Sequence, residues 1–167
     1  MIIILSILLW NCSIKAQNDC ERNAVMHLAA YNYIVNDSIN QNKEIVVSDS
    51  IVDLDTYWFF SKLIDFPEEK RKLEQNRENK NYIWNEPVYS PCLSSLFCRK
   101  NNSAKNVIFF SQIEDNMLRA DLLPHTWQLN EFRYDEMAHF TTGQIYLFIF
   151  DDDGTVKATF SSEIIYD

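Results

Sequence analysis

The stretch from Gly143 to Asp167 constrains the fold most strongly, because it reads as two β-strands joined by a tight turn. Residues 145–150 form an unbroken apolar, β-prone run, and residues 156–166 alternate between apolar and polar side chains. Residues 151–155, Asp-Asp-Asp-Gly-Thr, are types that favour turns. The sequence therefore predicts a C-terminal β-hairpin, and we expect it to be central to the sheet.

Two turns fit this hairpin, and they bury opposite faces of its strands, because one residue of slip exchanges the faces. A two-residue type I′ turn centred on Asp153-Gly154 directs Leu147 into the core. A type I turn that starts at Asp151, with Gly154 in the left-handed conformation, gives a three-residue loop with a bulge and directs Phe148 inwards. We favour the second turn, since aspartate suits its first position and glycine its fourth.

The favoured turn sets Phe148 opposite Ala158 and predicts that Phe148 packs against an N-terminal helix, near Leu28 and Tyr31. The unbroken apolar run also allows a third arrangement, in which both faces are covered. Under the favoured turn, one face collects these side chains: Tyr146, Phe148, Phe150, Val156, Ala158, Phe160 and Ile164.

Composition indicates a globular domain and excludes some function classes. Of the 167 residues, 47% are apolar and 14% aromatic, which suffices for a substantial core. The only two glycines, Gly143 and Gly154, exclude glycine-rich phosphate-binding loops. The aspartate run does not fit an EF-hand calcium loop either, because the required glutamate position falls on Phe160. We therefore expect a solvated turn there, and no cofactor.

The first 16 residues have the pattern of a secretory signal peptide. The apolar run Ile2–Trp10 is too short to span a bilayer, and Ala16 is a suitable cleavage residue. We expect an exported protein, periplasmic or secreted, with residues 17–167 as a single domain. One alternative is a bacterial lipoprotein acylated at Cys12, since Leu9 lies three positions earlier. The other alternative is that the first 16 residues form a buried strand or the end of a helix.

Charge limits the partners. The chain carries 15 basic and 24 acidic side chains, and removing residues 1–16 takes away only Lys15. This acidity argues against nucleic acid and anionic membranes as partners, so we expect membrane association only through a lipid anchor at Cys12. It leaves room for a cationic protein or small ligand.

Three cysteines remain after such processing: Cys20, Cys92 and Cys98. An oxidising compartment favours disulfides, and the short spacing of Cys92 and Cys98 predicts a bond between them. Cys20 is then left without a disulfide partner, unless it forms the bond with Cys92 or Cys98 instead. Their spacing and the lack of a nearby histidine argue against a zinc site.

The first half of the chain begins with a predicted helix over Cys20–Val35, introduced by a capping box. Its apolar face comprises Ala24, Leu28, Tyr31 and Val35. A strand over Glu44–Asp55 follows. A helix over Thr56–Phe66 is capped by Asp55, and Pro67 opens a second, solvated helix.

Residues 67–106 read as an irregular excursion from the core, with Pro87, Pro91 and asparagine-rich stretches. Tyr82, Trp84 and Tyr89 within it either line a groove or pin the loop to the domain. We favour pinning, and keep the three aromatics as candidate groove residues.

The remaining strands give an α+β fold. A second hairpin is predicted from residues 107–113 and 117–123, and residues 125–140 are ambiguous between helix and strand. The whole is an N-terminal helix on an antiparallel sheet of about five strands. This element order resembles the cystatin and nuclear-transport-factor-2-like layouts. The resemblance covers no motif and therefore implies no function.

Catalytic and metal signals are weak. Glu136 and His139 share a helical face, but a single such pair predicts no metal site. His125 and His139 are candidate general bases, and Ser94-Ser95 lacks the glycines of a nucleophile elbow. We expect a non-enzymatic domain that binds a protein or small ligand. The concave face of the sheet is the place considered for this binding. The alternatives are an inhibitor or immunity-type protein for a cationic partner, and a hydrolase using one of these histidines.

Overall fold

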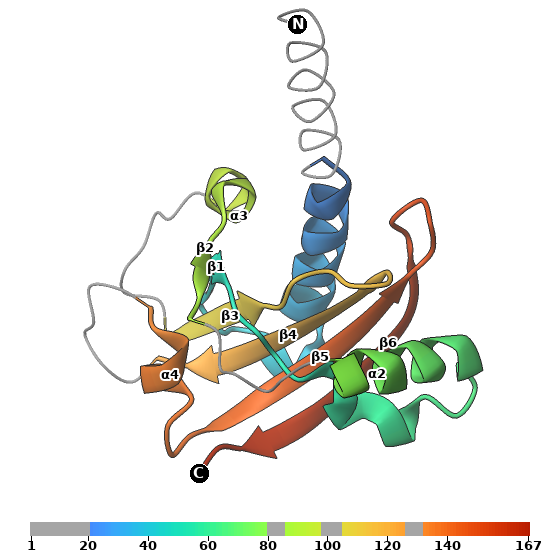
Figure 1. The fold of residues 1–167 in the computed structure, drawn as a ribbon. Helices are drawn as coiled ribbons and strands as arrows, with labels where there is room; N and C mark the ends of the chain where they lie inside the picture. Colours follow the sequence, from blue (N-terminus) through green and yellow to red (C-terminus); the bar gives the residue numbers. More distant parts are fainter. Residues whose placement is uncertain (1–20, 80–85, 98–104, 126–131) are drawn as a thin grey trace, which may run out of the picture.

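Six strands form one sheet in the order β2-β1-β3-β4-β5-β6, and the fold is α+β (Figure 1). The computed structural model describes residues 21–79, 86–97, 105–125 and 132–167. The strands are β1 (Ile45–Ile51), β2 (Val88–Tyr89), β3 (Asn106–Phe110), β4 (Met117–Pro124), β5 (Thr142–Phe150) and β6 (Val156–Ile165). The helices are the N-terminal helix (described over residues 21–36), η1 (Ser38–Asn40), η2 (Thr56–Lys62), α2 (Pro67–Asn79), α3 (Pro91–Leu96) and α4 (Tyr134–Met137).

The sheet is mixed, which corrects the predicted antiparallel sheet of about five strands. β1 and β3 run parallel, and the other neighbours are antiparallel. A parallel pair needs a long crossover, and residues 52–105 supply it. The sixth strand, β2, has only two residues, too few for an alternating pattern. The predicted hairpin is also less central than expected, because β6 lies at the end of the sheet opposite β2.

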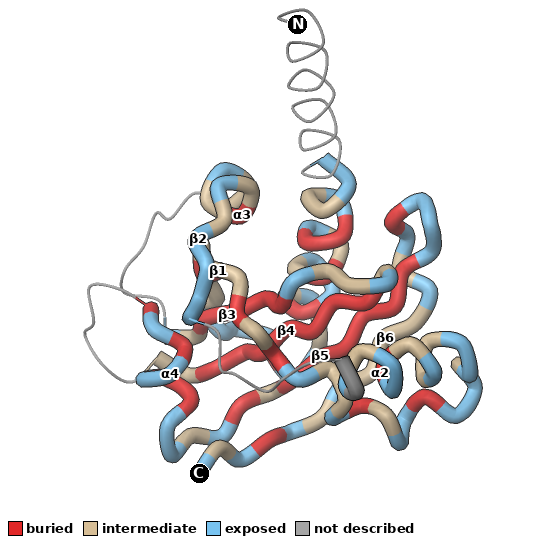
Figure 2. The backbone as a smooth tube through the Cα atoms, viewed as in Figure 1, coloured by how far each residue is buried: buried red, intermediate tan, exposed pale blue. Residues whose placement is uncertain are grey.

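Both faces of the sheet are covered, so the strands in its middle are buried throughout. On one face the N-terminal helix packs Met26, Ala30 and Ile34 against β3, β4 and β5. On the other face lie η2, α2 and α4, together with the segment after β1. Figure 2 shows the result as continuous burial along β3, β4 and β5.

The N-terminal helix is confirmed, but its predicted buried face is wrong. Leu28 is 38% exposed, whereas Met26, Ala30 and Ile34 are fully buried. Both sets recur at helical spacing, so the sequence contains two apolar stripes. The buried stripe has the small Ala30 at its centre, which lets the helix approach the sheet closely.

The turn of the closing hairpin is the favoured one, but the register is that of its rival. Gly154 has φ 86° and donates its N–H to the Asp151 carbonyl at 2.9 Å. Leu147 nevertheless lies opposite Phe160, because the register shifts between Ile149 and Phe150. This irregularity adds one residue to β6 and cancels the offset that the turn creates.

The extra residue divides the predicted apolar face between two cores. Tyr146, Phe148 and Phe150 face the N-terminal helix, whereas Phe160 and Ile164 face η2 and α2. Phe148 is fully buried as predicted, although its ring contact on the helix is Tyr33 at 5.6 Å. Leu147 is fully buried too, so the third arrangement is the observed one.

The middle of the chain is more regular than predicted. Asp55 caps η2 as expected, accepting the Tyr57 N–H at 2.9 Å, but this 3₁₀-helix ends at Lys62. The supposed excursion over residues 67–106 contains α2, β2 and α3. α2 is anchored by its single apolar residue, Leu73, which is buried with η2 and β5. Among the described residues, none of the helices has the length and apolar character needed to cross a membrane.

Candidate functional site

A buried ion pair on β4 organises one end of the sheet. Arg119 and Asp121 are two residues apart on a strand, so they point to the same face. Arg119 donates to Asp121 through Nε at 2.7 Å and Nη2 at 2.9 Å, and the side chains are 4% and 0% exposed. Arg119 Nη1 also donates to the Asp55 carbonyl at 2.5 Å, which ties β4 to the start of η2. The pair thus links two parts of the chain, β4 and the segment that leads into η2.

Two tyrosines complete this network. Tyr134 on α4 donates its hydroxyl to Asp121 Oδ2 at 2.7 Å, and Tyr166 after β6 donates to the same oxygen. Burial, and secondly the negative charge of Asp121, raises the pKa of both tyrosines well above its usual value. Both hydroxyls therefore stay protonated, and Asp121 fixes both rings in place.

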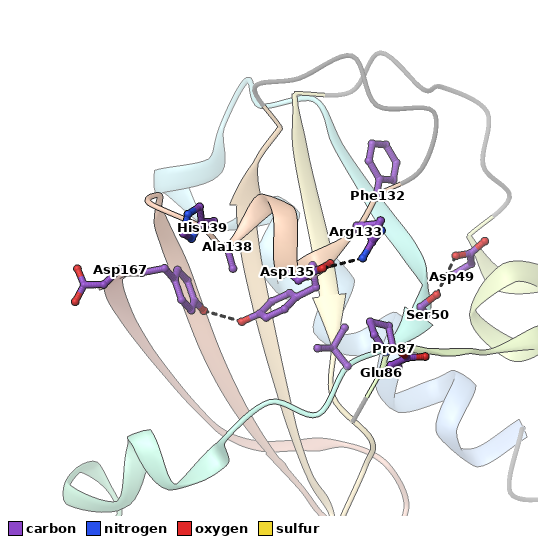
Figure 3. Close-up of a pocket in the computed structure, with 13 residues that line it drawn as sticks. Asp49, Ser50, Glu86, Pro87, Phe132, Arg133, Asp135, Ala138, His139 and Asp167 are labelled. Atoms are coloured by element: carbon purple, nitrogen blue, oxygen red, sulfur yellow. Dashed lines mark hydrogen bonds and ion pairs between the residues drawn. The ribbon is translucent and has the colours of Figure 1, made fainter. Parts of the chain in front are cut away.

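The two rings line an open pocket of about 860 Å³ (Figure 3). It lies between the end of β1, the segment leading into β2, α4 and the end of the chain after β6. Its apolar wall consists of Val52, Pro87, Phe132 and Ala138. A cavity of this size with apolar walls and a few polar groups is typical of small-ligand sites.

Carboxylates dominate the polar lining of the pocket. They come from four separate segments: Asp49, Glu86, Asp135 and Asp167. The basic residues in the lining are Arg133 and His139. Arg133 already binds Asp135 at 2.8 Å and Glu136 at 3.4 Å, so its charge is largely compensated. The pocket therefore presents an excess of negative charge.

The sequence-predicted aromatics do not build this pocket in the described part of the chain. Tyr82 and Trp84 lie outside the described residues. Tyr89 is exposed on β2 and does not line the pocket. The tyrosines that do, Tyr134 and Tyr166, gave no motif in the sequence. The signal in the sequence that could have indicated this network was the pair Arg119 and Asp121, two opposite charges two residues apart in the otherwise apolar strand 117–124.

The candidate histidines are separated. His139 is exposed and lines the pocket, with its ring 4.1 Å from that of Phe140. His125 is half-buried and packs its ring on Phe132, 5.0 Å away, without lining the pocket. Glu136 is exposed and paired with Arg133. In the described ranges, no three histidine, cysteine or acidic side chains are placed to hold a metal ion.

The cysteine predictions fall largely outside the described residues. Cys92 lies half-buried in α3 and is disulfide-bonded. Cys20 and Cys98, like Cys12 and the expected signal peptide, lie outside the described ranges. The bond between Cys92 and Cys98 therefore stays a prediction.

The fold and the pocket have to be interpreted on their own chemistry. The chain matches no protein-family model, no curated protein and no solved structure.

Proposed function

We propose that this protein is a non-enzymatic binding protein whose pocket accepts a ligand with a positively charged group and an apolar part. The observation that carries the proposal is the pocket of about 860 Å³ with four carboxylates around apolar walls. Charge complementarity of this kind selects cationic ligands and rejects anionic ones. The overall acidity of the chain supports the same choice of ligand.

Tyr134 and Tyr166 form what we call the floor of the pocket, and the rigidity of this floor supports a binding role. Tyr134 and Tyr166 are held by Asp121 and not by the ligand, so little ordering is needed on binding. Their hydroxyls are directed into the network; Tyr134 is buried, and the half-buried Tyr166 leaves part of its surface for the ligand. Aromatic ring faces attract cations, so the floor favours the same charge as the carboxylates.

The hydrolase alternative has less support. Among the described residues that line the pocket with His139, Ser50 is the only serine, and its hydroxyl donates to Asp49 at 3.4 Å instead of to a histidine. His125 does not line the pocket and packs its ring against Phe132. An inhibitor-type protein remains compatible with the proposal, because a basic side chain of a partner protein would satisfy the same carboxylates.

The proposal is tested with a matched pair of small probes on the full chain. Phenethylamine carries a cation on an aromatic ring, and phenethyl alcohol has nearly the same shape without the charge. We expect shift changes in NMR spectra around Tyr166 with the amine, weakened by salt because the charges are solvent-accessible. Equal binding of the alcohol would overturn the proposal.

Variants locate the binding. Glu86→Gln and Asp49→Asn each remove one carboxylate from the lining and should weaken amine binding about two- to five-fold, the range of exposed ion pairs. Glu74→Gln on α2 removes an exposed carboxylate that lines no described pocket, and should leave binding unchanged. Equal effects of all three variants would show a general charge effect and contradict a defined site.

A further inference from the structure

A second pocket, of about 410 Å³, adjoins the first. Val52 and Glu86 line both, so the two cavities lie on either side of these residues. The other residues that line the second pocket are Ile51, Asp53, Leu54, Thr56, Val88, Ser111, Gln112 and Glu114. No lysine, arginine or histidine is among its described lining residues, whereas Asp53 and Glu114 are. The two adjoining pockets together are therefore longer than one small ligand.

The edge strand β2 runs beside this double pocket. It pairs with β1 only at Ser50 and Ile51, and the Ser90 N–H donates to the Asp49 carbonyl at 2.8 Å. In an antiparallel pair, bonded positions alternate with positions whose main chain points the other way. Tyr89 accordingly directs its N–H and carbonyl towards the outer edge of the sheet.

The side chains on this edge are exposed as well. Val88 is 65% exposed and Tyr89 59% exposed, although both belong to a strand. Val88 also lines the second pocket. An edge strand with outward main-chain groups and adjoining side-chain pockets is the arrangement that binds extended peptides by strand addition.

We propose that the ligand of the two pockets is an extended peptide segment with two basic side chains, one for each pocket. This inference rests on the proposed function. The main chain of this segment pairs with Tyr89 on β2. Side chains of an extended chain point to the same side at every second residue. The basic residues therefore stand at positions i and i+2, and Glu86 lies between their binding pockets.

Two linked contacts bind more tightly than either alone, because the second forms within the complex. The test uses four fluorescently labelled hexapeptides that differ in the number and placement of arginines: Ser-Arg-Thr-Arg-Thr-Ser, two versions of it in which glutamine replaces one arginine, and Ser-Arg-Arg-Thr-Thr-Ser. Fluorescence anisotropy with the full chain gives each affinity. We expect the alternating peptide to bind at least about ten-fold more tightly than either single-arginine peptide. The adjacent-arginine peptide, with the same charge, should resemble the single-arginine peptides.

Equal affinity of the two doubly charged peptides would overturn the inference, because total charge would then explain binding. If phenethylamine binds but the second arginine adds nothing, the inference fails and the proposed function stands. If neither the amine nor any peptide binds, both fail.

A matched pair of variants locates the second pocket. Val88→Lys places a cation at its lining and should abolish the gain from the second arginine while leaving amine binding intact. Ile64→Lys changes a residue that is 77% exposed and lines neither described pocket, so it should retain the gain. Loss of the gain in both variants, or in neither, would contradict the assignment.

Discussion

Replacing Arg119 with methionine tests the buried network most directly. The variant keeps most of the side-chain volume but leaves the Asp121 carboxylate fully buried without its cation. Removing one partner of a buried ion pair costs about 3–5 kcal/mol. The bond from Arg119 to the Asp55 carbonyl is lost too, whereas the hydroxyls of Tyr134 and Tyr166 still donate to Asp121. These effects oppose each other, so we expect a loss of about 4 kcal/mol.

Urea unfolding, followed by the fluorescence of the chain's four tryptophans, measures this loss. With a denaturant slope of about 2 kcal/mol per molar, the midpoint should fall by roughly 2 M. The double variant Arg119→Met/Asp121→Asn removes both charges and keeps an acceptor for the tyrosines. It should be more stable than the sum of the single variants predicts, by at least about 1 kcal/mol. Additive effects, or a single-variant loss below about 1 kcal/mol, would refute the reasoning.

Three further predictions concern the core. Phe148→Ala and Leu147→Ala should each cost about 2–5 kcal/mol in urea unfolding, because both side chains are fully buried on opposite faces; a near-neutral result for either would contradict the two-sided core. Gly143→Ala should cost about 1–3 kcal/mol and lower Tm, because its added Cβ would lie 2.5 Å from Leu123 Cδ2. Burial lowers the pKa of His27 from 6.5 to about 4, so the unfolded chain binds the proton first and stability should fall by about 3 kcal/mol as pH falls from 6.5 to 4. His27→Leu should remove this part of the pH dependence, and an unchanged slope in that variant would assign it to other groups.

The sequence predicted local structure well where short-range chemistry decides it. Asp151 and Gly154 sufficed for the turn, and Asp55 and Pro67 marked helix starts. The register of the hairpin was not predictable in the same way. It depends on the irregularity near Phe150, and that in turn depends on packing against both cores. A turn therefore sets the register only when the strands behind it are regular.

The candidate site was largely beyond sequence reasoning, because it forms from distant segments. Arg119 and Asp121 alternate with apolar residues on β4, which usually indicates a solvent-exposed face. They are buried because α4 and the segment before η2 cover that face. Among the sequence-selected side chains that the structure describes, His139 lines the first pocket, and Tyr89, kept as a candidate groove residue, lies next to Val88 of the second, whereas His125 and Glu136 line neither.

The parallel pairing of β1 with β3 has a consequence for the order of folding. β3 to β6 form a meander of antiparallel neighbours, whose contacts are close in sequence. β1 reaches β3 only across residues 52–105, so its docking carries a larger loop-closure entropy. We expect the meander to form first, with β1 joining it in the slowest step. In pulse-labelled hydrogen exchange, amides of β4 and β5 should gain protection before the β1 amides that bond to β3.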